Sequence, residues 1–182
     1  MEIRPLRLFG AFEIVLRPKQ DQRGYFMRAY DESLFCSHSL NSSWVQENEA
    51  VSLKKGVIRG LHFQRPPHAE VKLVRVVQGA VLDAFVDLRR TSPTYGQWET
   101  VELSAENHRA VYIPKGFAHG YCTLTDSSVV LYKVDTPYAP DSEGGLLWKD
   151  QDLAIPWSVD DPIVSAKDAS LPLLREFVTP FD

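Results

Sequence analysis

Several residues in apolar segments of the chain carry side chains that could move a proton or stabilise a charge. His62 lies between two apolar residues in RGLHFQ (59–64), and an imidazole can take up or release a proton near neutral pH. Lys72, Asp83 and Tyr132 lie in three further apolar runs. Buried charges are costly unless they pair, and they gather at functional sites as well as in structural ion pairs. Taken alone, His62 is more simply a core histidine, and Tyr132 a core tyrosine with its hydroxyl at a rim.

The two runs EVKLVRVV (70–77) and AVLDAFVDL (80–88) predict how the lysine and the first aspartate meet. They flank a Gln-Gly pair, a two-residue loop of the kind that closes a tight hairpin. In such a hairpin Lys72 lies diagonally between Asp83 and Asp87, within reach of both. In this geometry Lys72 either takes part in a functional site or forms a structural ion pair. Asp87 lies nearer the strand end and is expected to be structural.

The spacing of turn residues predicts the fold that must position these groups. Gly, Pro, Asn, Asp and Ser recur at short intervals, and runs rich in Val, Tyr, Phe and Leu lie between them. This pattern is typical of an all-β sandwich or barrel. Short helices are expected only at 31–38 and 169–177. A tight turn at 126–127 is expected to pair the strand of Tyr132 with the strand that begins at His119.

Composition and charge narrow the class of protein. A chain of 182 residues with 44% hydrophobic and 24% charged residues fits one soluble domain. The net charge of −4 gives no general attraction to nucleic acid, and two cysteines are too few for a disulfide framework. The N-terminal segment is interrupted by charged residues, so we expect neither a signal peptide nor a membrane span. We therefore expect a cytoplasmic location.

Six motifs occur in order along the chain: RGLHFQ, KLVRVVQGAVLDAFVDLR, SPTYGQW, LSAENHRAVYIPKGFAHG, LYKVDTPYAP and EGGLLWKDQDLAIPW. Together they resemble the dTDP-4-dehydrorhamnose 3,5-epimerase family, and the match runs from DQRGYF (21–26) to SAKDASLPLL (165–174). PKGFAH alone is shared by many cupins, whereas six motifs in order are specific.

The resemblance implies an all-β, cupin-like jelly roll: a double-stranded β-sandwich or barrel with a few short helices. A single domain would then span residues 1–182. An N-terminal arm of about residues 1–45 would contribute to a homodimer, and a C-terminal segment of about residues 160–182 would pack against the barrel. The family uses neither a metal nor an organic cofactor. The residues themselves also argue against a metal site, because a metal-binding cupin needs clustered imidazoles and the histidines here are scattered.

The resemblance also implies a reaction. The family's substrate is a 4-keto-6-deoxyhexose linked to dTDP, and its C4 ketone acidifies the C–H bonds at C3 and C5. Epimerisation converts dTDP-4-dehydro-6-deoxy-D-glucose to dTDP-4-dehydro-L-rhamnose. It needs a base on one face of the ring, stabilisation of the enolate, and an acid on the opposite face.

By the resemblance, His62 is the base, and Asp168 is the carboxylate that orients its ring; Asp168 would otherwise be expected to cap a helix. Lys72 stabilises the enolate oxygen. In the predicted hairpin, Asp83 lies beside Lys72 and would hold its ammonium in place. Tyr132 is the acid that returns the proton from the other face of the sugar.

Further residues are expected to bind the nucleotide. Guanidinium groups suit a pyrophosphate because they form charge-assisted hydrogen bonds with its oxygens. The expected phosphate-binding residues are Arg23 and Arg59, those expected to stack on the base are Phe26 and Tyr138, and those expected to line the pocket are Gln46, Asn48 and His119.

The chain departs from the family pattern at two positions. Arg28 stands where the family commonly has a glutamate, and Glu49 stands where it commonly has a histidine. Both positions are expected near the nucleotide pocket. Arg28 reverses a charge there, so it is a candidate nucleotide-binding residue, and the preference for thymine becomes an open question.

Three alternatives to a double epimerase remain open. A close variant would epimerise only C3 or only C5, or act on a sugar carried by another nucleotide. A metal-dependent cupin oxygenase or isomerase is a different class of enzyme. A non-catalytic cupin that binds nucleotide sugars would not need the His62, Lys72, Tyr132 and Asp168 set.

Overall fold

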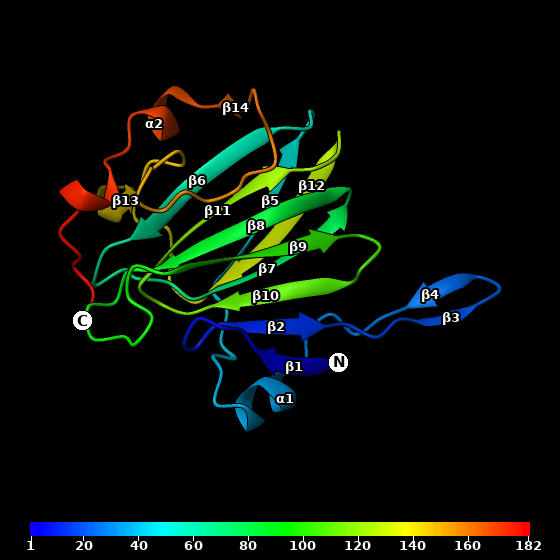
Figure 1. Cartoon of the computed structure of the whole chain (residues 1–182). Helices are drawn as coiled ribbons and strands as arrows, with labels where there is room; N and C mark the ends of the chain where they lie inside the picture. Colours follow the sequence, from blue (N-terminus) through cyan, green and yellow to red (C-terminus); the bar gives the residue numbers. More distant parts are fainter.

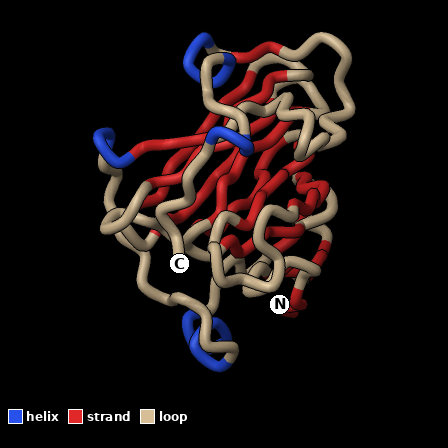
Figure 2. The backbone as a smooth tube through the Cα atoms, turned by 60° about the vertical axis from the view of Figure 1, so that its left-hand side comes forward, coloured by secondary structure: helices blue, strands red, loops and turns tan.

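A computed structural model describes residues 1–182, and almost all of its regular structure is β-strand (Figures 1 and 2). The first sheet runs in the order β1 (Glu2–Pro5), β2 (Phe12–Val15), β10 (Arg109–Ile113), β7 (Lys72–Gln78), β12 (Ser128–Val134), β5 (Gln46–Ser52). The second sheet runs in the order β13 (Glu143–Gly145), β6 (Val57–Gln64), β11 (Phe117–Thr123), β8 (Ala80–Asp87), β9 (Trp98–Ser104), with β14 (Ile163–Val164) parallel to β6. Strands β3 (Lys19–Asp21) and β4 (Gly24–Phe26) form a separate hairpin. The helical segments are α1 (Glu32–Ser37), α2 (Ala166–Ala169) and the 3-10 turns η1 (Pro140–Ser142) and η2 (Leu174–Glu176).

The two sheets face one another, and apolar side chains fill the space between them. Val74 and Val111 of the first sheet pack in one buried cluster with Phe85, Val101 and Tyr121 of the second. Strands with apolar side chains on both faces must be covered on both sides. Two further buried clusters cover the outer faces of the two sheets. One lies around β6, β8 and β11 with the C-terminal residues, and the other joins the first sheet to the segment that contains α1. The sandwich confirms the predicted all-β fold.

The predicted hairpin between β7 and β8 is wrong. Strand β7 pairs with β10 and β12 in the first sheet, whereas β8 pairs with β9 and β11 in the second. The chain crosses from one sheet to the other at Gly79, whose φ is +71°. The backbone of this corner bonds to other loops: Ala80 N–H donates to Thr125 Oγ1 at 2.9 Å, and Ala105 N–H donates to the Gly79 carbonyl at 3.0 Å.

The predicted pairing of β12 with β11 is wrong for the same reason. The turn at 126–127 also carries the chain between the sheets, and β12 pairs with β5 and β7. Lys55 N–H donates to Asp126 Oδ1 at 2.7 Å, which ties this corner to a neighbouring loop. As a result Tyr132 and His119 belong to opposite sheets instead of adjacent strands.

One of the two predicted helices is present. Helix α1 begins after Asp31, whose side chain accepts a hydrogen bond from Leu34 N–H at 3.1 Å as an N-cap. The predicted helix over 169–177 is wrong: α2 ends at Ala169, and only the short turn η2 follows. Pro172 explains the break, because a proline disfavours helical geometry in the residue before it and removes a backbone donor.

The two ends of the chain are placed differently. Near the N-terminus, β1 and β2 extend the first sheet, and the β3–β4 hairpin projects away from the body (Figure 1). At the C-terminus, Phe181 is buried, and its ring centroid lies 5.4 Å from that of Phe63. No helix is both long enough and apolar enough to cross a membrane.

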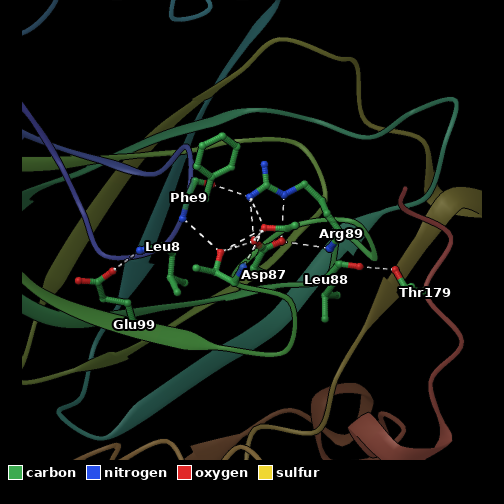
Figure 3. Close-up of polar contacts among 9 residues, drawn as sticks. Leu8, Phe9, Asp87, Leu88, Arg89, Glu99 and Thr179 are labelled. Atoms are coloured by element: carbon green, nitrogen blue, oxygen red, sulfur yellow. Dashed lines mark hydrogen bonds and ion pairs between the residues drawn. The ribbon is translucent and has the colours of Figure 1, made fainter.

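Asp87 organises a polar cluster where β8 ends (Figure 3). Its buried carboxylate accepts from the Arg89 guanidinium at 2.8 and 2.9 Å and from Thr94 Oγ1 at 2.7 Å. The same guanidinium lies 4.7 Å from the Phe117 ring centroid and bonds to the Phe9 carbonyl. These contacts join the N-terminal loop to the end of β8, so Asp87 has the structural position that the sequence predicts.

Candidate active site

A cavity of about 550 Å³ lies where β6 and β11 of the second sheet face β7 and β12 of the first. A second cavity of about 340 Å³ shares three of its lining residues, His62, Lys72 and Tyr132. The three side chains predicted to perform the chemistry therefore stand at the junction of the two cavities.

His62 and Asp168 form a hydrogen-bonded pair on one side of this junction. His62 Nε2 lies 2.8 Å from Asp168 Oδ1, and Gly60 N–H donates to Asp168 Oδ2 at 3.0 Å. Asp168 is buried and is the third residue of α2, whose N-cap is Ser165. The aspartate thus does not cap the helix; the helix directs its carboxylate at the histidine, as the family resemblance implied.

Gly60 allows β6 to approach β11 closely beside the pair. Its φ is +114°, and a Cβ there would lie 2.6 Å from the Cα of Gly120. Any side chain would push the strands apart and move His62, which pairs across the strands with His119.

The surroundings of His62 favour its neutral form. Burial lowers its pKa below the ordinary value for histidine, and the nearby charges of Lys72 and Lys167 lower it further. The Asp168 carboxylate opposes these effects but does not reverse them. With Nε2 bonded to Asp168, Nδ1 has no hydrogen-bond partner in the protein. A neutral imidazole with a free nitrogen is suited to accept a proton.

Lys72 and Tyr132 project from the opposite sheet. Lys72 pairs in register with Val134, so Tyr132 is its diagonal neighbour across β7 and β12. Burial raises the pKa of Tyr132, and the carboxylate of Glu70 raises it further. The phenol is therefore protonated at neutral pH and can donate a proton.

The predicted role of Asp83 as the partner of Lys72 is wrong. Because β7 and β8 lie in opposing sheets, Asp83 instead accepts from His119 Nε2 at 2.8 Å. The ammonium of Lys72 pairs with Glu70, with 3.2 Å between Nζ and Oε1. Burial raises the pKa of Asp83, although His119 and Lys72 oppose that effect.

Five of the predicted binding residues line the two cavities. Arg59 and His119 line the larger cavity, where Arg59 Nη2 donates to the Val51 carbonyl at 3.0 Å. Gln46 and Asn48 line the smaller cavity with Tyr138, which is 58% exposed at its rim.

This arrangement agrees with the comparisons with known proteins. A model of the dTDP-4-dehydrorhamnose 3,5-epimerase family matches residues 5–176. The chain belongs to this family. Members with this name are isomerases, so the predicted family and enzyme class are confirmed.

Individual epimerases are similar over most of the chain. The dTDP-4-dehydrorhamnose 3,5-epimerase of Methanothermobacter thermautotrophicus is 46% identical over 168 residues, which cover 90% of each protein. The crystal structure of the Bacillus anthracis enzyme of that name, with TDP and PPi bound, is 46% identical with a TM-score of 0.93. That alignment covers 95% of this chain and 99% of the other. A dTDP-4-dehydrorhamnose 3-epimerase of Streptomyces niveus is 38% identical over 177 residues, covering 97% of this chain and 85% of the relative.

Three residues that the epimerase resemblance assigns to the nucleotide lie outside both cavities. Arg23 sits on the projecting hairpin and pairs with Asp21 at 2.6 Å, and Phe26 on the same hairpin is 74% exposed. Arg28 pairs with Asp31 at 2.8 Å. Within one chain these residues do not meet the catalytic side chains.

Glu49, which was expected near the nucleotide pocket, lines neither cavity of this chain. Asn48 and Ala50 on either side of it line the two cavities. Successive side chains of a strand point to opposite faces, so Glu49 points to the outer face of the first sheet.

Several polar residues of the cavities were not predicted from the sequence. They are Gln64, Glu70, Tyr121, Glu143, Ser165 and Lys167. Glu143 and Lys167 form an ion pair of 2.5 Å, and the buried Tyr121 hydroxyl has no partner in the protein. Strand alternation would have placed Glu70 on the same side as Lys72. No group of three or more His, Cys, Asp or Glu side chains is arranged to hold a metal ion.

Proposed function

We propose that this chain epimerises C3 and C5 of dTDP-4-dehydro-6-deoxy-D-glucose to give dTDP-4-dehydro-L-rhamnose, without a cofactor. The observation that carries the proposal is the placement of a neutral, carboxylate-bonded histidine and a protonated tyrosine on opposite sheets around one cavity. Inversion of a carbon needs a base and an acid on opposite faces of the ring. A sugar held between the sheets would meet one on each side.

Each step uses a group of the chain. His62 removes the proton from a carbon next to the C4 ketone, and Asp168 stabilises the imidazolium that forms. The electron pair of the C–H bond becomes the enolate, whose oxygen the largely buried Lys72 ammonium stabilises. Tyr132 then donates a proton to the same carbon from the other face. Before the second carbon reacts, the His62 imidazolium releases its proton to solvent and the Tyr132 phenolate takes one up, which restores the base and the acid. The same steps then invert the carbon on the other side of the ketone.

The nucleotide end of the substrate would extend along the cavities. Arg59 is suited to the pyrophosphate, and the exposed ring of Tyr138 to stacking on the base. The Bacillus anthracis relative with TDP and PPi bound supports a nucleotide site in this fold.

We also propose a homodimer in which the N-terminal arm completes the site of the partner subunit. Arg23, Phe26 and Arg28 lie outside the cavities of their own chain, and the β3–β4 hairpin projects from the body. The cavity of a second copy of the chain is the simplest site to which such a hairpin could bring substrate-binding groups.

Both cysteines are free, which supports a reducing, cytoplasmic setting.

The function is tested by incubating the protein with dTDP-4-dehydro-6-deoxy-D-glucose and following the sugar by NMR. We expect signals of the L-configured 4-keto sugar. An unchanged D-sugar after prolonged incubation with folded protein would contradict the proposal.

A further inference from the structure

Glu70 is the acidic residue that pairs with Lys72. It lies two residues before the lysine, just ahead of β7, and both side chains line the smaller cavity. Their side chains are only 13% and 11% exposed, and 3.2 Å separates Glu70 Oε1 from Lys72 Nζ. Water screens this pair much less than it screens an ion pair on the surface.

The other oxygen of Glu70 is held by a buried amide. The two hydrogens of Gln64 Nε2 are shared among three acceptors, which are the His68 carbonyl at 3.0 Å and Glu70 Oε2 and the Pro137 carbonyl at 3.3 Å each. Gln64 Oε1 accepts from Ala139 N–H at 2.6 Å. Two backbone segments therefore fix the amide, and the amide fixes the carboxylate.

No other protein group holds the Lys72 ammonium. Asp83 is bonded to His119, and the ammonium has no ion-pair partner besides Glu70. A lysine side chain has four rotatable bonds, so an untethered ammonium would occupy several positions in the cavity. A charge that stabilises an enolate is effective only when it is already in place as the enolate forms.

On the basis of the function proposed above, we propose that Glu70 is a positioning residue, which holds the Lys72 ammonium at the cavity junction where the enolate oxygen develops. Gln64 supports it by fixing the carboxylate. Glu70 itself touches neither the reacting carbons nor the ketone in this scheme.

The carboxylate has a second effect, on the acid. Tyr132 faces Glu70, Glu143 and Tyr138, which add to burial in raising its pKa, whereas Arg59 lowers it. His62 and Lys72 line the same space. Removing the charge of Glu70 removes one cause of the raised pKa, so Tyr132 would lose its proton at a lower pH. The basic limb of the kcat profile would then move to lower pH.

The test compares Glu70→Gln with Glu70→Asp across a pH series, with Asp152→Asn as the control. The Gln variant keeps the shape but removes the charge, and the Asp variant keeps the charge. Asp152 forms an exposed pair with Arg175 at 3.0 Å, outside both cavities. For Glu70→Gln we expect kcat to fall about 10- to 100-fold, KM to change less than about threefold, and the basic limb to move to lower pH. Glu70→Asp should keep the wild-type limb, and Asp152→Asn should match wild type throughout.

A double-mutant cycle with Lys72→Met shows whether Glu70 acts through the lysine. If it does, adding Glu70→Gln to Lys72→Met should lower kcat less than about threefold further. Fully additive losses, or a Glu70→Gln variant with wild-type kcat and an unmoved limb, would overturn the inference. Circular dichroism melting identifies a Glu70→Gln variant that has failed to fold. The cycle is then run with Glu70→Asp in its place, and fully additive losses there would overturn the inference. Wild-type protein that leaves the sugar unchanged would instead contradict the proposed function.

Discussion

Nε2 of His62 lies 2.8 Å from Oδ1 of Asp168, although the two residues are 106 positions apart in the chain. Strand β6 supplies the histidine and the short helix α2 supplies the carboxylate, and β14 beside β6 brings the two segments together. This contact leaves Nδ1 as the nitrogen that can accept a proton.

His62→Ala should nearly abolish epimerisation, because it removes the proposed base. General base catalysis contributes about 10²- to 10⁴-fold, so a loss in that range or larger is expected in kcat. Binding of dTDP, measured by calorimetry, should change little because other residues contact the nucleotide. Turnover close to that of wild type would exclude His62 as the base.

Asp168→Asn should shift the pH dependence as well as lower the rate. In the wild type His62 must be neutral to act as a base, so activity falls as the pH drops below its pKa. Burial already holds that pKa below the ordinary value for histidine, and Asp168 works in the opposite direction. Removing the negative charge should lower the pKa further and move the acidic limb of kcat/KM to lower pH. An acidic limb that stays in place or moves to higher pH would contradict the assignment of this limb to His62.

Mixing two variants with defects in different parts of the site tests whether the arm serves the partner subunit. In the proposed dimer, Arg23→Ala keeps an intact cavity and His62→Ala keeps an intact arm. Random re-assortment of equal amounts should restore about a quarter of the wild-type activity, since half the dimers are mixed and each has one intact site. Mixing His62→Ala with Asp168→Asn is the control, because both defects lie in the same cavity and no intact site can form. Equal activity in the two mixtures would show that each arm serves its own chain.

Asp87→Ala should destabilise the fold without touching the catalytic set. The substitution leaves the partly buried Arg89 guanidinium without its carboxylate, and loss of one member of a buried pair costs about 3–5 kcal/mol. Chemical denaturation should show the loss in the free energy of unfolding, whereas kcat of the remaining folded protein should be unchanged. Asp152→Ala, which breaks an exposed pair, should leave the denaturation midpoint near that of wild type.

Much of the site was predictable from the sequence, because its residues lie in short motifs that resemble those of the epimerase family. His62, Lys72, Tyr132 and Asp168 were assigned by resemblance. The structure brings the first three to the junction of the two cavities, and Asp168 lines the larger cavity, where it is bonded to His62. Asp168 could not have been joined to His62 by local reasoning, since only the fold brings these distant segments together.

The strand connections were not predictable in the same way. A Gln-Gly pair between two apolar strands can close a hairpin or carry the chain from one sheet to the other, and Gly79 serves the second geometry. Hydrogen bonds from distant loops decide between the two geometries, and a local sequence pattern does not contain those hydrogen bonds. The wrong hairpin assigned Asp83 to Lys72. The actual partner is Glu70. Its spacing of two residues from Lys72 is enough to predict that the two side chains lie on the same side of an extended chain.

The central claim is tested most directly by solvent exchange at the sugar carbons. The protein is incubated with dTDP-4-dehydro-6-deoxy-D-glucose in deuterated water, and deuterium at C3 and C5 is followed by NMR, with His62→Ala as the control. We predict deuterium at both carbons together with the L configuration in the wild type, and almost none in the variant. Deuterium at one carbon only would mean a single-site epimerase, and no deuterium at either carbon would contradict proton abstraction beside the ketone of this substrate.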